Sequence, residues 1–131
     1  MLPIRLSLRN FMSYRENVPT LNLEGHHVLC LSGDNGHGKS ALLDAITWAL
    51  WGRSRAKGDD DLIHHGEPSM EVMLDFEAQE NLYRVIRKRS RGSGRRPGTS
   101  VLELQVASGD GFKPITGNRL DETQEKIKDL L

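Results

Sequence analysis

The chain has 131 residues, a formal net charge of zero and one cysteine. That length fits one domain of ordinary size with a single small core. The neutral balance excludes any argument from overall charge for a nucleic-acid or membrane surface, so such an argument must come from local clustering. The lone cysteine, Cys30, excludes a disulfide framework within the chain. Because no apolar stretch suits a signal peptide or approaches the roughly 20 residues of a spanning helix, we expect a cytoplasmic protein with no membrane partner.

The first third of the chain predicts three strands. Residues 3–9 alternate apolar and polar side chains, the period of a strand with one face on a core. Leu21 and Leu23 indicate a second strand, which the Glu24-Gly25 pair would end in a hairpin turn. The continuous apolar run at 28–31 is typical of a strand that is covered on both faces. This third strand leads directly into a glycine-rich loop.

A helix is predicted from Lys39 to Trp51, because this segment contains neither Gly nor Pro and Gly52 follows as a stop signal. Its apolar residues predict a buried helix. They are Leu42, Leu43, Ile46, Ala49 and Leu50. Residues 53–68 include three consecutive aspartates and predict a loop with at most a short ordered turn.

Regular structure then resumes as a small antiparallel meander. Strand patterns cover 71–77, 82–89 and 100–106. The connections at 90–99 and 108–111 are rich in Gly, Ser and other polar residues, which predicts exposed loops.

The last segment predicts a second helix. Asn118 is a candidate N-terminal cap, and Leu120, Gln124, Ile127 and Leu131 share one stripe. The helical pattern still continues at the last residue, so we expect the chain to be part of a longer one.

The strongest motif is GDNGHGKS at 33–40, which satisfies G-x-x-x-x-G-K-[ST] between a predicted strand and a predicted helix. Gly33, Gly36 and Gly38 let the backbone turn tightly and present N–H groups to phosphate oxygens. The helix that follows adds the partial positive charge of its N-terminus. The pattern predicts a phosphate-binding loop, and a glycine-rich turn that matches by chance is the alternative.

The loop also supplies a cation and a metal ligand. Lys39 would contact the β and γ phosphates as the candidate catalytic residue, and the Ser40 hydroxyl would bind Mg²⁺. His37 occupies a variable position and is interpreted as a loop residue, not a catalytic base. The pairs His26-His27 and His64-His65 are neighbours on the chain, so neither suits a shared zinc ion.

The sequence around this motif resembles the SbcC family, a branch of the SMC-like ATPases that act with a nuclease on DNA double-strand breaks. The segments that carry the resemblance are LRNFMSYRE at 8–16 and LSGDNGHGKSALLDAITWALWGRSRA at 31–56. The match extends from Pro3 to about Phe76. Transporter ATPases share the loop type but lack the early N-F-x-S-Y segment.

The resemblance implies several nucleotide contacts. Ser13 matches a turn that approaches the nucleotide, whereas Met12 replaces a basic residue found in some members. Residues 60–65 resemble a stretch that approaches the adenine and ribose. Asn35, Lys39, Ser40 and Ala41 match the family's loop directly. The predicted cofactor-binding set is Ser13, Gly33, Asp34, Asn35, Gly36, His37, Gly38, Lys39, Ser40 and Ala41.

The implied fold class is α/β: a P-loop NTPase of the ABC-type head, with a mixed sheet, a Walker A helix and an antiparallel lobe. We expect a Walker A core at 1–68, the antiparallel lobe at 69–116 and the start of an outgoing helix at 117–131. The glutamine lid, signature and Walker B segments of such heads are absent here, because the run at 72–75 comes too early and suits a meander strand. The chain alone is therefore expected to bind ATP weakly and barely hydrolyse it.

The implied partners are the C-terminal half of the same head, a second head in a homodimer, an SbcD-like nuclease and double-stranded DNA, at the nucleoid. A related SMC-like or RecF-like head that serves DNA maintenance is one alternative. Another is a non-enzymatic DNA-binding module with a vestigial phosphate loop.

A basic cluster supports the nucleic-acid interpretation. Residues 84–96 contain seven Arg or Lys side chains and no acidic one. Without an interleaved aromatic residue, such a cluster would contact phosphates independently of sequence. Alternatively, the arginines face acids such as the run at 59–61. The predicted DNA contacts are Arg87, Arg89, Arg91, Arg95 and Arg96.

Overall fold

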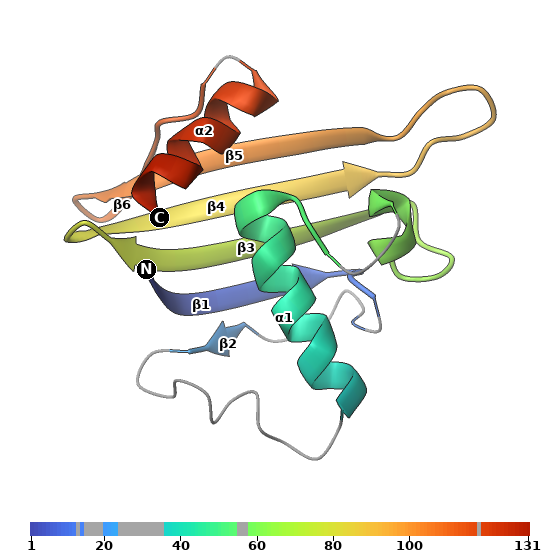
Figure 1. The fold of residues 1–131 in the computed structure, drawn as a ribbon, viewed down its shortest axis with the longest axis horizontal. Coiled ribbons are helices and arrows are strands. Elements are labelled where there is room, and N and C mark those ends of the chain that lie inside the picture. The colour runs from blue at the N-terminus through green and yellow to red at the C-terminus, as the bar shows by residue number, and fades with distance from the viewer. Residues whose placement is uncertain (13, 15–19, 24–35, 55–57, 118) are drawn as a thin grey trace.

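The computed structural model describes residues 1–12, 14, 20–23, 36–54, 58–117 and 119–131, and gives the backbone alone for 36–40. The described strands form one six-stranded sheet in the order β2-β1-β3-β4-β5-β6, and every neighbouring pair is antiparallel (Figure 1). The strands are β1 Leu2–Arg9, β2 Leu21–Asn22, β3 Ser69–Ala78, β4 Asn81–Ser90, β5 Thr99–Ser108 and β6 Gly111–Pro114. The helices are α1 Gly36–Trp51, the short 3-10 helix η2 Asp59–Leu62 and α2 Leu120–Leu130.

The predicted strands at 3–9, 71–77, 82–89 and 100–106 are confirmed, as is the helix that ends at Trp51. The predicted strand at 28–31 lies outside the described residues, so the mixed sheet stays a prediction. β1 pairs directly with β3, with Leu6 opposite Leu74. The regions expected to form a Walker A core and an antiparallel lobe therefore share one sheet.

Two tight turns build the meander. β3 and β4 are joined through Gln79 and Glu80, which both have positive φ (50° and 69°), as a two-residue hairpin turn requires. β5 and β6 are joined through Gly109, with φ of 59°, and Asp110, so the predicted turn at 108–111 is confirmed. The longer connection between β4 and β5 extends past the other strands (Figure 1).

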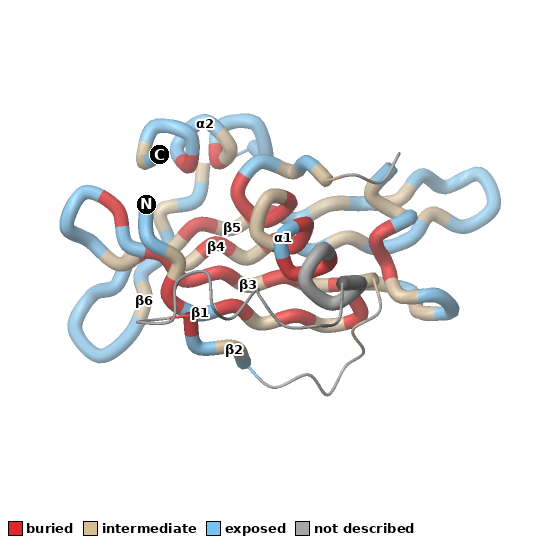
Figure 2. The backbone as a smooth tube through the Cα atoms, turned by 60° about the horizontal axis from the view of Figure 1, so that its bottom comes forward, coloured by how far each residue is buried: buried red, intermediate tan, exposed pale blue. Residues whose placement is uncertain are grey.

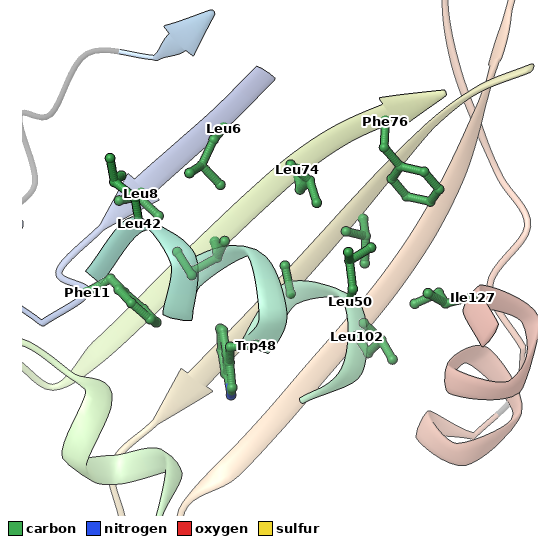
Figure 3. Close-up of a cluster of buried hydrophobic side chains, with 14 of the residues drawn as sticks. Leu6, Leu8, Phe11, Leu42, Trp48, Leu50, Leu74, Phe76, Leu102 and Ile127 are labelled. Carbon is green, nitrogen blue, oxygen red and sulfur yellow. The ribbon is translucent and has the colours of Figure 1, made fainter. Parts of the chain in front are cut away.

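One face of the sheet carries the core, and α1 and α2 cover it (Figure 1). Burial alternates along β1 and the first part of β3 because successive side chains point to opposite faces (Figure 2). The close-up shows the side chains that meet between sheet and helices (Figure 3). They include Leu6, Leu8, Phe11, Leu42, Trp48, Leu50, Leu74, Phe76, Leu102 and Ile127.

The prediction of a buried helix is confirmed for one side of α1 but is wrong for Leu43. Ala45, Trp48 and Ala49 face the sheet and have no exposed surface, whereas Leu43 and Trp51 are 51% and 40% exposed. The helical repeat explains the difference, because positions 43, 47 and 51 fall on the side of α1 that points away from the sheet.

The second helix is confirmed, but its buried face differs from the predicted stripe. Thr123 and Ile127 are fully buried, while Leu120 and Leu131 are each 43% exposed. Arg119 occupies the N-cap position, and the proposed cap Asn118 lies outside the described residues. No helix in the described part of the chain is long and apolar enough to cross a membrane.

Candidate nucleotide-binding site

The phosphate-loop motif runs into the start of α1. The helix begins at Gly36, so the backbone of residues 36–40 forms its first turn. The first N–H groups of a helix have no acceptor within it and point toward any anion at this end. No acidic residue occupies this turn. Ser13, Gly33, Asp34 and Asn35 lie outside the described residues, and nothing is described of the His37, Lys39 and Ser40 side chains.

Buried side chains fix where this helix end lies. Ala41 and Leu42 begin the buried side of α1 directly after the motif. Further along, the Trp48 ring lies 6.0 Å from the ring of Phe11, and its Nε1 donates to Asp59 Oδ1 at 3.2 Å. Phe11 follows β1 and Asp59 begins η2, so α1 is held to the two loops for which the resemblance implies nucleotide contacts.

These two loops are joined to each other by backbone hydrogen bonds. The N–H of Met12 donates to the Leu62 carbonyl and the N–H of His64 to the Asn10 carbonyl, both at 2.6 Å. His64 Nδ1 also lies 2.6 Å from the Met12 carbonyl oxygen. Asn10 and Met12 adopt left-handed φ values of 56° and 51°, which turns the chain sharply just before Ser13.

A pocket of about 450 Å³ lies beside the joined loops. The structure thus brings the turn after β1 together with residues 60–65, the two segments for which the resemblance implies nucleotide contacts. The Arg89 guanidinium donates a hydrogen bond that lowers the pKa of Asp60 below its usual value. The lining residues are Met12, Asp60, Asp61, Ile63, His65 and Arg91.

The far end of α1 is capped by side chains from two other elements. Arg87 of β4 donates through Nε and Nη2 to the Ala49 carbonyl at 3.2 Å, and Gln124 Nε2 of α2 donates to the Leu50 carbonyl at 2.8 Å. Arg87 Nη2 also donates to Gln124 Oε1 at 2.6 Å. Burial lowers the pKa of Arg87 to about 10, and the charge of Asp59 opposes that shift.

The sequence interpretation did not find this cap. Gln124 did offer a signal, because it is the one polar residue in a stripe of Leu120, Ile127 and Leu131. A polar side chain on a packed helix face needs a hydrogen-bond partner. The identity of that partner depends on how β4 packs beneath both helices, and the periodicity of the sequence does not predict this packing.

The five predicted DNA contacts lie in different environments. Arg87 is buried, and Arg89 contacts Asp60 at 2.8 Å, as the alternative interpretation anticipated for that side chain. Arg91 donates to the carbonyl groups of Glu67, Asp60 and Ile63 at 2.8 to 3.3 Å.

Arg95 and Arg96 are exposed and lie in the connection between β4 and β5. Neither side chain makes a hydrogen bond or ion pair with the described part of the chain. They are the members of the predicted set that a phosphate backbone could reach without breaking an internal contact.

The carboxylate that ends the 72–75 run belongs to a structural ion pair. Asp75 is buried within β3 and accepts from Arg84 Nε and Nη2 at 2.7 and 3.0 Å, while Arg5 lies 3.4 Å away. The Arg84 guanidinium lies 3.9 Å above the Phe112 ring. The expectation that this run is a meander strand is confirmed. Within the described residues, no group of three His, Cys, Asp or Glu side chains is arranged to hold a metal ion.

A helix that begins within a G-x-x-x-x-G-K-[ST] motif is typical of a P-loop ATPase domain, and the antiparallel sheet beneath it is consistent with such a domain. The family described as "AAA domain" matches residues 5–131, and the chain belongs to this family. The chain is 35% identical over 135 aligned residues to the SbcC component of the nuclease SbcCD of Deinococcus radiodurans. That alignment covers 100% of this chain and 14% of the relative.

A second relative is a "DNA double-strand break repair Rad50 ATPase" of Thermoplasma volcanium, with 36% identity over 83 residues, 63% of this chain and 9% of that protein. The SbcC component of the nuclease SbcCD of Staphylococcus aureus is 30% identical over 94 residues, 67% of this chain and 9% of the relative. The resemblance to SbcC-type ATPases is confirmed. The chain spans only a small part of the length of each of these relatives.

Proposed function

We propose that this chain forms the N-terminal, ATP-binding part of an SbcC-like ATPase for DNA double-strand-break repair. The observation that carries the proposal is the position of the GDNGHGKS motif, whose second half forms the first turn of α1. An anion at this end meets free backbone N–H groups and the positive end of the helix dipole. The names of the relatives supply the repair process.

The residues present suit ATP with Mg²⁺. The backbone N–H groups of 33–40 would hold the phosphates, Lys39 would place its charge on the β and γ phosphates, and Ser40 would bind the metal. The ion would neutralise charge that develops on the phosphates during transfer. The pocket beside residues 60–65 would receive the ribose and adenine, and Ser13 would contact the nucleotide from the Met12 turn that this pocket adjoins. Hydrolysis would also require the glutamine lid, signature and Walker B segments, which residues 1–131 do not include.

The connection between β4 and β5 supports a contact with double-stranded DNA. Arg95 and Arg96 are exposed at its tip, and Arg91 fixes its base to the η2 loop through three carbonyl groups. Two cations on a tethered projection suit a phosphate backbone. Arg89 would support the base of this connection through Asp60 and Ser100, whereas Arg87 is buried at the end of α1 and would not contact DNA.

The remaining partners are inferred from the relatives and from one unpaired surface. The outer side of α1 exposes Leu43 and Trp51 beside a groove of about 550 Å³ that α2 also lines. Such a surface suits the C-terminal half of the same head. A second head, an SbcD-like nuclease and a cytoplasmic location at the nucleoid complete the proposal.

Nucleotide binding in the full-length protein tests the central claim. Lys39→Ala should abolish most Mg²⁺-dependent ATP affinity, measured by calorimetry or fluorescent-nucleotide titration. Lys126→Ala, which changes an exposed lysine of α2, is the matched control and should bind as the parent protein does. Equal affinity in the two variants would contradict a phosphate site. No Mg²⁺-dependent affinity in the parent protein would favour the vestigial-loop alternative.

DNA binding is tested separately in the same full-length protein. Replacing Arg95 and Arg96 by Ala should weaken duplex binding and reduce the slope of log affinity against log salt by about 2, one unit for each phosphate contact. Lys88→Ala removes an exposed cation from the strand itself and is the control. An unchanged slope in the double variant would refute the proposed contact.

A further inference from the structure

Three elements meet at the C-terminal end of α1, opposite the phosphate loop. Arg87 reaches this end from β4 and Gln124 from α2, and each donates to a carbonyl that the helix itself leaves unpaired. A third carbonyl, that of Trp48, accepts from the N–H of Gly52 at 2.8 Å. Gly52 has a φ of 70°, and a Cβ there would lie 3.1 Å from Arg87 Nη1. The end of α1 is closed tightly around these two side chains, which we call the Arg87–Gln124 bridge.

The hydrogen bonds and the charge of this bridge fix the orientation of both side chains. Gln124 uses both halves of its amide, since Oε1 accepts from Arg87 and Nε2 donates to Leu50. Arg87 places a buried positive charge at the negative end of the helix dipole. Because α1 is a continuous helix of 16 residues, a shift at one end moves the other. The phosphate-binding end and α2 are thus joined by one rigid element.

A purely structural role does not account well for a buried arginine. Well-packed apolar residues of similar volume often stabilise a core as well as buried charged groups do. What the charge and the amide add is a defined geometry between helices that otherwise meet through few side chains, such as Ile127 and Leu50 (Figure 3). The bridge fixes how α2 lies against the helix that carries the phosphate loop.

We propose that Arg87 and Gln124 are positioning residues that couple the placement of α2 to nucleotide occupancy of the phosphate loop through α1. This inference rests on the proposed function. Nucleotide that binds at the first turn of α1 would also favour the docked position of α2. By linkage, docking of α2 would raise nucleotide affinity by the same factor.

Amide hydrogen exchange of the full-length protein, with and without Mg²⁺-ATP, tests this coupling. In the parent protein nucleotide should slow exchange in both α1 and α2. In Gln124→Ala the protection of α1 should persist, whereas that of α2 should be lost and nucleotide affinity should fall about fivefold, the lower bound of typical coupling. Lys126→Ala is the matched control, because Lys126 Nζ ties α2 to the Ile115 carbonyl at 2.9 Å and does not reach α1.

Gln124→Glu provides a second variant should Gln124→Ala fail to fold. A carboxylate can still accept from Arg87 but cannot donate to the Leu50 carbonyl, so the same loss of α2 protection is expected. Retained α2 protection in a folded Gln124 variant would overturn the inference. So would nucleotide protection of α1 without protection of α2 in the parent protein. Absence of protection in both helices would instead overturn the nucleotide site and the inference with it.

Discussion

Two buried charged side chains, Asp75 and Arg87, are each contacted by residues from more than one element. Asp75 of β3 is contacted by Arg84 of β4 and Arg5 of β1, and Arg87 of β4 is contacted by α1 and α2. Burying each of these charged groups is unfavourable because the group loses its hydration, and its hydrogen bonds within the protein offset most of that loss. Removing one partner therefore lowers stability by an amount that depends on how well water can reach the group that remains.

Asp75→Ala should lower the free energy of unfolding by about 3 kcal/mol, the low end of the range for breaking a buried ion pair. The effect lies at the low end because Arg84 is partly exposed and can be hydrated once Asp75 is removed, while Arg5 is already hydrated. Urea denaturation measures the change. Glu77→Ala is the control, because Glu77 is an exposed carboxylate on the same face of β3. An equally small effect of both substitutions would contradict a structural role for the Asp75 pair.

Asp60 should contribute a pH-dependent part of stability. Its hydrogen bond from Arg89 lowers the pKa of the folded state below the ordinary value of 3.8, so the contribution is present above that value and is lost as pH falls through the folded pKa. Between about pH 6 and about pH 3, the unfolding free energy of the parent chain should fall more than that of Asp60→Asn. Because the pair is partly exposed, high salt should shrink the difference. Parallel curves for the two proteins would contradict the linkage.

Sequence patterns predicted the structure correctly where it depends on neighbouring residues in the chain. The strand at 3–9, the stop at Gly52 and the turn at 108–111 each follow from period, glycine or turn chemistry, and the structure has all three. The roles of Arg87 and Gln124 depend on contacts across 37 positions of the chain. A periodicity argument contains no information on such a contact, so it assigned Arg87 to the exposed basic cluster.

Among the elements, the β4–β5 hairpin is the one whose rigidity matters for the proposed DNA contact. Its base is fixed where Arg91 donates to the η2 loop and where Arg89 contacts both Asp60 and Ser100. At Gly98 the backbone also lies close to Arg89 and Ser90 of β4. A Cβ there would lie 2.6 Å from Arg89 Nη2 and 2.7 Å from the Ser90 carbonyl oxygen.

Gly98→Ala should therefore lower the melting temperature by about 3–8 °C, because an added methyl group must displace backbone as well as a side chain. Gly111→Ala is the matched control, since a Cβ at Gly111 meets nothing within 4 Å. Thermal unfolding followed by circular dichroism compares the two. If both variants melt with the parent chain, the hairpin base is looser than its contacts indicate.

The helices show where element prediction reaches its limit. Both exist where the sequence placed them, yet the buried face of each was assigned incorrectly in part. Composition gives α1 apolar side chains nearly all round, and only the sheet decides that Trp48 points inward while Leu43 and Trp51 point outward. A single exposed apolar side chain is ordinary, but exposed apolar residues that line up along one side of a helix form a patch that suits a partner.

At the scale of the whole molecule, the outer side of α1 is the feature that the sheet and α2 leave unpaired. The sheet packs against one side of α1, and α2 packs at its C-terminal end (Figure 1). Neither of them covers the opposite side of the helix. Leu43, Thr47 and Trp51 follow one another at intervals of four along the opposite side. The proposed C-terminal half of the head would cover this stripe.

Leu43→Glu should accordingly behave differently in two contexts. In the 131-residue chain the change should alter the unfolding free energy by no more than about 0.5 kcal/mol, as for other exposed positions. In the full-length protein the same charge would be buried against the docked half without a partner, and should lower both stability and ATP turnover. Val101→Glu, at an exposed valine of β5 on the face of the sheet opposite α1, is the control for both contexts. If full-length Leu43→Glu matched that control in melting and turnover, the stripe would be a solvent-facing surface and the docking partner would have to bind elsewhere.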